Sequence, residues 1–304
     1  MKNPVKNPAS AVLPGTSLTI CSRNRPQLLL ETVESVLESQ EVPQEIVIVD
    51  QSDLPHPELQ EMGAVRGCEI RYLQIPSNGV GRARNQAIEA ASHDILVLTD
   101  DDMLVAPTWF GTLVRSLVDK GERAVVTGRV LAAEEEGVTG FAPSTKSDEE
   151  PRVYEGRVGK DILYTGNMIM FRSAVDEVGV FDERLGAGAH FPAAYDNDFG
   201  YRLLEAGYRV FYEPEAVLYH RAWRASGAYF RLRWNYGRGQ GAFHAKHLSL
   251  RDPYMLRRLL WNVARHLVRF PYRILIRSKR AVGDLVFVFG LFSGAGEWLL
   301  TQRR

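Results

Sequence analysis

The chain has 304 residues, of which 45% are hydrophobic, and it carries 37 basic and 37 acidic side chains. This length suffices for one large domain or two moderate ones, and the composition excludes a mainly disordered chain. Two cysteines are too few for a disulfide framework, so we expect reduced thiols and a cytoplasmic protein.

The zero net charge conceals a strong segregation of charge along the chain. Residues 1–220 hold 20 Lys and Arg against 34 Asp and Glu, whereas residues 221–280 hold 15 against 1. A basic segment beside an acidic body predicts an anionic partner, either a membrane surface or a polyanion. Residues 1–16 contain no apolar run, so we expect a flexible tail there and no secretory signal.

Strands alternate with helices in the first part of the chain. Apolar runs predict buried strands over 17–23, 45–50 and 70–74, and apolar spacing predicts a helix over 28–39. This alternation favours a parallel sheet, whose ligands bind at the carboxyl ends of its strands. Asp50 ends one such strand, where it could bind a nucleotide or simply cap a turn.

A turn rich in glycine and arginine follows the third strand, with the sequence Asn78-Gly79-Val80-Gly81-Arg82-Ala83-Arg84-Asn85. The glycines permit close approach of the backbone to a ligand, and arginines at a helix N-terminus attract phosphate. The same residues would also suit an ordinary turn that opens a solvated helix. Because the turn directly precedes the next strand, its position favours a diphosphate site.

Three consecutive carboxylates, Asp100, Asp101 and Asp102, follow the buried strand over 94–99. Neighbouring like charges raise one another's pKa unless a cation or several donors offset them, and an all-oxygen cluster suits Mg²⁺ or Mn²⁺. Asp100 and Asp102 are spaced to approach one ion that also holds a diphosphate, which leaves Asp101 for a sugar or ribose hydroxyl. The alternative is a polar turn that caps the following helix.

Three features stand out in the second half. The acidic segment 134–150 predicts a loop, either a lid or a surface insertion. Asp196 and Asp198 open a helix, where a carboxylate serves as a cap or, if a hydroxyl must be deprotonated, as a general base. His220 follows a strand over 216–219 and is either an ordinary hydrogen-bonded side chain or a metal ligand.

From Arg221 onward the pattern is helical, basic and aromatic. The uncharged segment 285–296 is too short to cross a bilayer, which takes about 20 apolar residues. We therefore expect an interfacial amphipathic anchor on anionic lipid. A C-terminal helix packed on the rest of the protein and a polyanion-binding arm are the alternatives.

In their order and spacing, these motifs resemble the family 2 glycosyltransferases of GT-A fold. The likeness covers roughly residues 17–220 and rests on several linked segments, which are 24–26, 49–50, 78–85, 100–102, 165–171, 179–186, 196–203 and 219–220. It implies an α/β GT-A fold, with a Rossmann-like mixed sheet flanked by helices, plus an α-helical C-terminal extension. The expected divisions are a tail over 1–16, a catalytic domain over 17–222 and an extension over 223–304.

The resemblance also implies roles for the acidic residues. Asp50 and Asp100 are similar to the nucleotide-binding carboxylates of the family, and Asp102 is similar to its metal ligand. Asp196 corresponds to the general base, with Asp198 as the fallback because Tyr195 stands where the family usually has Glu.

Further site residues follow from the same resemblance. Arg84 is expected near the diphosphate, and His220 is expected to be a second ligand of Mg²⁺ or Mn²⁺. The remaining residues expected to bind the nucleotide-sugar are Arg23, Asn24, Asn78, Gly81 and Asp101.

The implied activity is transfer of a sugar from a nucleoside-diphosphate donor, commonly UDP-linked, to a glycan or lipid-linked acceptor in cell-surface polysaccharide synthesis. A single displacement requires one base and inverts the anomeric centre. We expect peripheral contact with the inner face of the cell membrane and no nucleic-acid partner. The alternatives are a sugar nucleotidyltransferase and a non-catalytic membrane-associated binding protein on the same fold.

Overall fold

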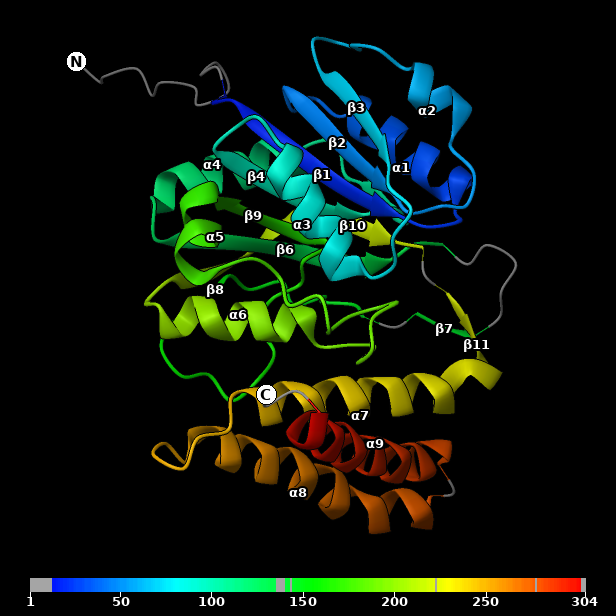
Figure 1. The fold of residues 1–304 in the computed structure, drawn as a ribbon, viewed down its shortest axis with the longest axis vertical. Helices are drawn as coiled ribbons and strands as arrows, with labels where there is room; N and C mark the ends of the chain where they lie inside the picture. The colour runs from blue at the N-terminus through cyan, green and yellow to red at the C-terminus, as the bar shows by residue number, and fades with distance from the viewer. Residues whose placement is uncertain (1–12, 135–139, 143, 222, 277, 302–304) are drawn as a thin grey trace, which may run out of the picture.

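The computed structural model describes residues 13–134, 140–142, 144–221, 223–276 and 278–301. Most of the expected tail, residues 1–12, and part of the expected acidic loop, residues 135–139 and 143, lie outside this set. Figure 1 shows an α/β layer, formed by the first two thirds of the chain, and a layer of three long helices beneath it.

A mixed sheet of nine strands forms the centre of the α/β layer. Eight of the strands lie in the order β3-β2-β1-β4-β9-β6-β10-β5, and β8 pairs with β10. β1 to β4 are mutually parallel, whereas β9 runs antiparallel to both β4 and β6. The strands are β1 (Thr16–Ser22), β2 (Glu45–Asp50), β3 (Glu69–Gln74), β4 (Ile95–Asp100), β5 (Met103–Val105), β6 (Ala124–Ala132), β8 (Arg152–Tyr154), β9 (Asn167–Phe171) and β10 (Arg209–His220).

Strand register brings the acidic side chains to one edge of the sheet. Ser22, at the end of β1, pairs with Asp50 on β2, and Cys21 pairs with Asp100 on β4. The carboxyl ends of these strands therefore lie side by side, as the alternation of strands and helices predicts. Both cysteines are buried and unbridged, as expected.

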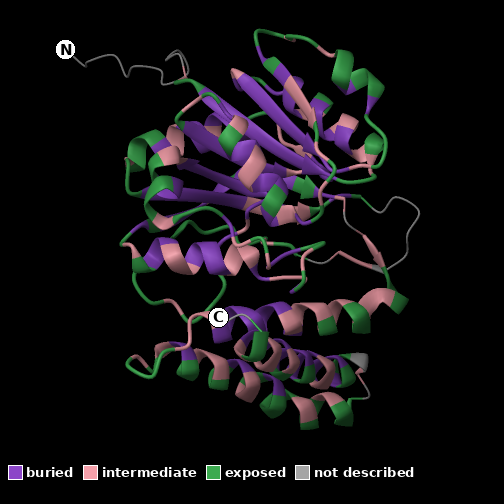
Figure 2. Cartoon of the chain, in the orientation of Figure 1, coloured by how far each residue is buried: buried purple, intermediate pink, exposed green. Residues whose placement is uncertain are grey.

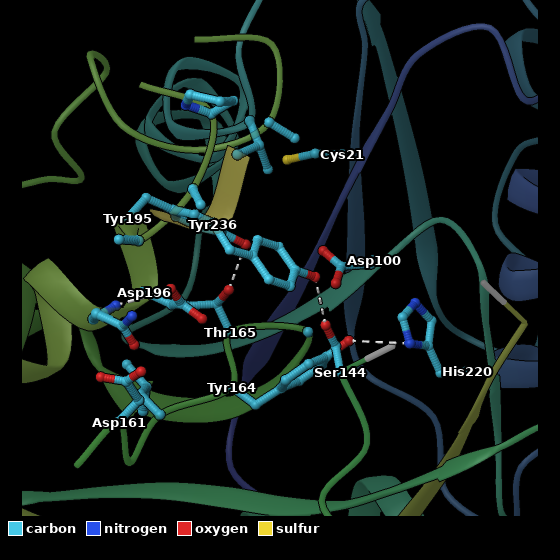
Figure 3. Close-up of a pocket in the computed structure, with 18 of the residues that line it drawn as sticks. Cys21, Asp100, Ser144, Asp161, Tyr164, Thr165, Tyr195, Asp196, His220 and Tyr236 are labelled. Atoms are coloured by element: carbon cyan, nitrogen blue, oxygen red, sulfur yellow. Dashed lines mark hydrogen bonds between the residues drawn. The ribbon is translucent and has the colours of Figure 1, made fainter. Parts of the chain in front are cut away.

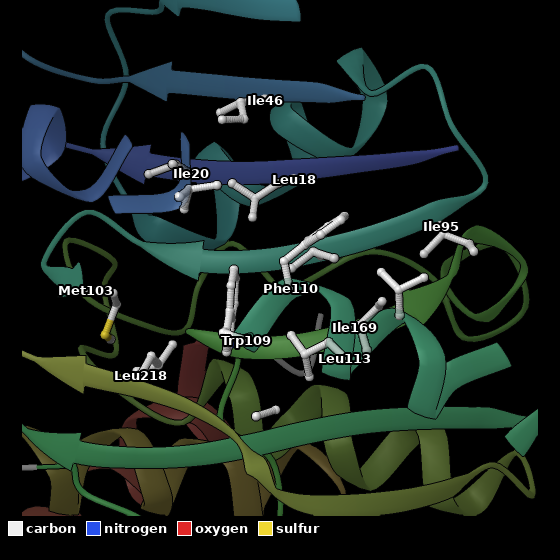
Figure 4. Packing of buried hydrophobic residues seen from close by; sticks show 14 of the residues in the cluster. Leu18, Ile20, Ile46, Ile95, Met103, Trp109, Phe110, Leu113, Ile169 and Leu218 are labelled. Carbon is white, nitrogen blue, oxygen red and sulfur yellow. The ribbon is translucent and has the colours of Figure 1, made fainter. Parts of the chain in front are cut away.

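Helices cover both faces of the sheet, and their apolar sides form two cores. One core lies under α1 and α4, where Trp109 and Phe110 are fully buried, and the other lies under α3, α5 and α6 (Figures 2 and 4). Helix α1 begins at Pro26, two residues before the expected start, because proline is well suited to the first turn. The helices of this layer are α1 (Pro26–Leu37), α2 (Pro57–Glu61), α3 (Val80–Ala90), α4 (Trp109–Lys120), α5 (Arg172–Val178) and α6 (Tyr195–Glu205).

The C-terminal extension starts from a small two-stranded sheet, in which β11 (Arg224–Ala225) pairs with β7 (Gly140–Phe141). A 3₁₀ turn, η2 (Ser226–Ala228), then leads into α7 (Tyr229–Lys246), α8 (Tyr254–Leu275) and α9 (Lys279–Thr301). The mixed α/β sheet flanked by helices and the helical C-terminal region expected from the sequence are confirmed.

Helices α7 and α9 pack closely because glycines line their contact. A Cβ at Gly241 would collide with the carbonyl oxygen of Leu291, and one at Gly294 would collide with that of Arg238. The segment 285–296 lies inside α9 and packs against α7 on one side, while Phe289 and Phe292 are exposed, so its expected role as a surface anchor stays a prediction. Within the described residues, one helix, Arg280–Thr301, is long and apolar enough to cross a membrane, yet 44% of its most apolar window is buried in the fold.

Candidate active site

A cavity of about 890 Å³ opens at the carboxyl edge of the sheet and extends to the helical extension. Figure 3 shows Asp100 and His220 on one side of this cavity and Asp161 and Asp196 on the other. Side chains from both layers line it, including those of α7, α8 and α9. The cavity therefore joins the acidic sheet edge to the basic extension.

Asp101 and Asp102 of the acidic triplet share one arginine, Arg25, as a positively charged partner. Buried Asp101 accepts hydrogen bonds from Ser22 Oγ at 2.8 Å and from Arg25 at 3.0 Å, and Arg25 also lies 3.0 Å from Asp102. Burial, reinforced by Asp102 and Asp100, raises the pKa of Asp101 to about 6 despite the Arg25 guanidinium. The Arg25 guanidinium thus offsets only part of the effect of burial on Asp101.

Asp102 and His220 come together from distant parts of the chain. Strand β5 pairs with the end of β10, which brings His220 Nε2 within 3.4 Å of Asp102 Oδ1, and Tyr164 Oη lies 3.4 Å from the other ring nitrogen. Burial favours the protonated acid, but His220 and Arg25 together hold the pKa of Asp102 below its usual value.

The pair is chemically suited to a hard divalent cation. Mg²⁺ is commonly held by one or two carboxylates together with substrate phosphates, a role for which Asp102 is suited, so a cage of protein ligands is not required. The part of the chain that the structure describes contains no group of three or more His, Cys, Asp or Glu arranged for a metal. Asp102 and His220 both line the cavity and therefore fit this mode of binding.

Arg84 lies beneath the cavity floor and does not line it. Its side chain is fully buried and forms an ion pair with Asp100, while its Nε has no hydrogen-bond partner. Nearby, Tyr195 Oη lies 2.6 Å from Thr165 Oγ1. Arg84 therefore positions Asp100 at the edge of the cavity, and its expected place near the diphosphate stays a prediction.

Asp196 and Asp198, although two residues apart, have opposite environments. Asp196 lines the cavity, and burial together with the Asp161 carboxylate raises its pKa to about 7. Asp198 is fully buried, does not line the cavity, and contacts three side chains, namely Arg202 at 3.0 Å and Lys246 and the His247 ring at 2.7 Å each. Asp198 thus connects α6 to α7, which removes the support for it as a fallback base.

The expected nucleotide-sugar residues divide into two groups. Arg23, Asn78, Asp100 and Asp101 line the cavity, and Arg23 donates a hydrogen bond to Asn78 Oδ1. The main chain of β2 brings Gln51 to the cavity wall, next to the expected Asp50.

Asp50, Asn24 and Gly81 do not line the cavity, for local reasons. Asp50 is buried and accepts a 2.6 Å hydrogen bond from Tyr72 Oη. Asn24 exchanges hydrogen bonds with Asp53 at the surface, and Gly81 packs beneath the Asp182 carbonyl, where a Cβ would be only 3.2 Å from its oxygen. These three residues shape the turns around the site.

The extension contributes cavity residues that the sequence interpretation missed. Arg233, Tyr236 and Gln240 of α7 line the cavity, as do Arg265 of α8 and Phe287 of α9. The spacing of the α7 residues, i, i+3 and i+7, places them on one helix face. That pattern was available in the sequence, but the basic and aromatic character of the segment suggested a membrane surface.

Comparison with known proteins identifies the family to which this chain belongs. The profile of "Glycosyl transferase family 2" matches residues 17–179. A pre-mycofactocin glycosyltransferase from Mycobacterium tuberculosis is 29% identical over 61% of this chain and 40% of its own length. A glucosyl-dolichyl phosphate glucuronosyltransferase from Haloferax volcanii is 26% identical over 67% of this chain and 68% of its own length. The alignment with the mycobacterial relatives thus spans well under half of their length.

Solved structures show the same fold. A mannosyltransferase from Pyrobaculum calidifontis in complex with GDP-Man and Mn²⁺ superposes with a TM-score of 0.59 at 16% identity, covering 98% of this chain and 92% of the other. GalNAc-T7 with UDP, GalNAc and Mn²⁺ gives a TM-score of 0.55 at 19% identity, covering 80% and 52%. The family profile spans more than half of the sequence, and these neighbours share its architecture. The chain therefore belongs to glycosyl transferase family 2 and has the GT-A fold.

Proposed function

We propose that the protein transfers a sugar from a nucleoside-diphosphate sugar, with UDP as the expected nucleotide, to an acceptor hydroxyl with inversion. The observation that carries this proposal is the presence of the Asp100–Asp102 cluster and Asp196 in one cavity. The cluster would bind the donor diphosphate together with its cation, and Asp196 would receive the proton of the acceptor hydroxyl. The solved neighbours, which contain UDP or GDP-Man with Mn²⁺, support a donor of this class.

Asp196 acts as the general base in this mechanism. A base works best when its pKa is close to the operating pH, and a pKa of about 7 meets that condition. Asp196 removes the proton of the acceptor hydroxyl as its oxygen attacks the anomeric carbon, and the bond to the diphosphate breaks on the opposite side. One base suffices for this displacement, and no covalent nucleophile is needed.

Asp102 and His220 would hold the divalent cation, which supplies Lewis-acid stabilisation of the diphosphate charge when bound. Arg25 lies 3.0 Å from both Asp101 and Asp102 and keeps the two carboxylates in place. Arg84, paired with Asp100 from below, fixes the orientation of that carboxylate toward the cavity.

The acceptor belongs to a glycan or is linked to a lipid, in synthesis of a cell-surface polysaccharide at the inner face of the membrane. The Haloferax relative, whose name describes action on a dolichyl phosphate-linked sugar, supports a lipid-linked acceptor. Helix α8 supports membrane contact, because its exposed face combines arginines such as Arg257 and Arg269 with large apolar side chains. The most exposed of these are Trp261, Val268, Tyr272 and Leu275.

Thermal unfolding with UDP, GDP, CDP and dTDP, each with and without Mn²⁺, tests the donor site. Ligands that bind the folded state raise its apparent stability by mass action, so one diphosphate should raise Tm strongly only when Mn²⁺ is present. Asp102→Asn should abolish the rise in Tm that depends on Mn²⁺. Asp176→Asn, which removes the same charge at an exposed position on α5, should retain that rise.

The turnover product separates this proposal from its alternatives. A glycosyltransferase releases the nucleoside diphosphate, whereas a sugar nucleotidyltransferase would release pyrophosphate. If no diphosphate stabilised the protein with Mn²⁺, the proposed donor site would be wrong.

A further inference from the structure

The wall of the cavity contributed by the extension includes two arginines from different helices, Arg233 of α7 and Arg265 of α8. The guanidinium of Arg233 lies over the Phe287 ring at 4.5 Å from its centre and donates a 3.2 Å hydrogen bond to the carbonyl oxygen of Gly283. Its side chain is 20% exposed. This arginine is therefore held in a fixed orientation while part of its guanidinium remains accessible.

The positive charge of these arginines is poorly compensated. Arg265 makes no hydrogen bond or ion pair with the described residues. Nearby Asp161 accepts 2.8 Å hydrogen bonds from Arg258 and from Gln240. Its carboxylate is thus already occupied.

Asp284, the other carboxylate close to Arg233, is also occupied. It is buried, lies 2.7 Å from His266 Nδ1 and pairs with Arg273, whereas Arg233 is more distant at 3.6 Å. Burial lowers the pKa of both Arg233 and Arg265, and neighbouring arginines add to this, with Arg265 acting on Arg233 and Arg269 acting on Arg265. An anion in the cavity would remove this penalty, since it would supply the missing opposite charge.

Arg233 is separated from the proposed base, Asp196, by about the length of a charged sugar. Asp161, whose carboxylate raises the pKa of Asp196, is hydrogen-bonded to Gln240 on α7. Arg233 precedes Gln240 by seven residues on the same face, about 10 Å along the helix axis. A sugar that carries a charged group at one end can bridge such a separation.

We propose that Arg233 and Arg265 bind a phosphate group of the acceptor and thereby direct the acceptor hydroxyl toward Asp196. This inference rests on the proposed function and names the class of acceptor. Two guanidinium groups with little acidic compensation match a dianion, and the planar fork of arginine suits phosphate oxygens. The phosphate belongs either to a prenyl lipid or to a phosphorylated sugar, and the chemistry of recognition is the same for both.

The test measures binding by titration calorimetry to the full chain saturated with UDP and Mn²⁺, so that the donor site is filled. The two probes are citronellyl phosphate, which represents the lipid source, and glucose 6-phosphate, which represents the glycan source. Arg233→Gln combined with Arg265→Gln should weaken binding of the preferred probe by about tenfold per arginine. The matched control, Arg231→Gln combined with Arg251→Gln, removes two exposed arginines of the extension that lie outside the cavity and should leave binding unchanged.

The outcomes separate the inference from the proposed function. Binding of either probe that falls in the cavity variant but not in the control supports the inference, and the tighter probe identifies the phosphate source. Equal affinity in both variants, or no binding of either probe to the UDP-saturated protein, overturns it. Failure of UDP to bind with Mn²⁺ in the unmodified chain would instead refute the proposed function.

Discussion

Replacing Asp196 by Asn should stabilise the protein while it abolishes transfer. The carboxyl group lines the cavity, and its pKa is raised from 3.8 to about 7 by burial and by Asp161. A shift of one pKa unit corresponds to about 1.4 kcal/mol, so full burial would place the cost of ionised Asp196 near 4 kcal/mol at high pH. Because the side chain is partly exposed to the cavity, we expect about 2 kcal/mol.

The sign of the pH dependence follows from the raised pKa. Between pH 4 and 7 the folded state binds this proton and the unfolded state releases it, so the contribution of Asp196 to stability falls as pH rises. Asp196→Asn should therefore match the unmodified chain near pH 3 and exceed its unfolding free energy by about 2 kcal/mol at pH 8. Urea unfolding followed by circular dichroism measures both values, with Asp176→Asn as the control.

The rate of sugar transfer should fall in Asp196→Asn, although the stability of this variant rises. Loss of a general base costs about 10²- to 10⁴-fold in rate, and the rate of the unmodified enzyme should rise with pH and level off above pH 7. Release of nucleoside diphosphate is the readout. If Asp196→Asn lowered stability at pH 8, or retained transfer, the assignment of a buried, proton-accepting carboxylate would be wrong.

Two further predictions concern packing and membrane contact. Asp198→Asn removes the carboxylate shared by Arg202, Lys246 and His247, and Lys246 keeps Asp182 at 2.8 Å, so unfolding free energy should fall by about 3 kcal/mol in urea titrations. A loss no larger than that of Asp176→Asn would show that these ion pairs do not hold α6 to α7. Replacing exposed Trp261 by Gln should reduce co-sedimentation with phosphatidylglycerol vesicles, since a buried aromatic contributes about 1.5–3 kcal/mol. Equal sedimentation of this variant and the unmodified chain would contradict contact through α8.

Local sequence patterns determined the elements of the catalytic layer. Apolar runs bounded by Gly, Pro and Asp indicated β1, β2 and β4, and their alternation with helices predicted the shared edge where Asp100 and Asp102 lie. Such patterns are readable because strand burial and helix periodicity act over a few neighbouring residues. The ordered motifs across residues 17–220 also indicated the family, which the comparisons confirm.

Tertiary structure alone decided which of these polar side chains face the cavity. Asp196 and Asp198 look equivalent in sequence, but one faces open space while the other meets Lys246 from a helix 48 residues away. The position of Arg233 in the cavity was also not predictable from the sequence. A basic helix has the same residue pattern whether its arginines face lipid or a cavity. Burial and charge pairing depend on contacts between segments far apart in the chain, and those contacts have no signature in local residue order.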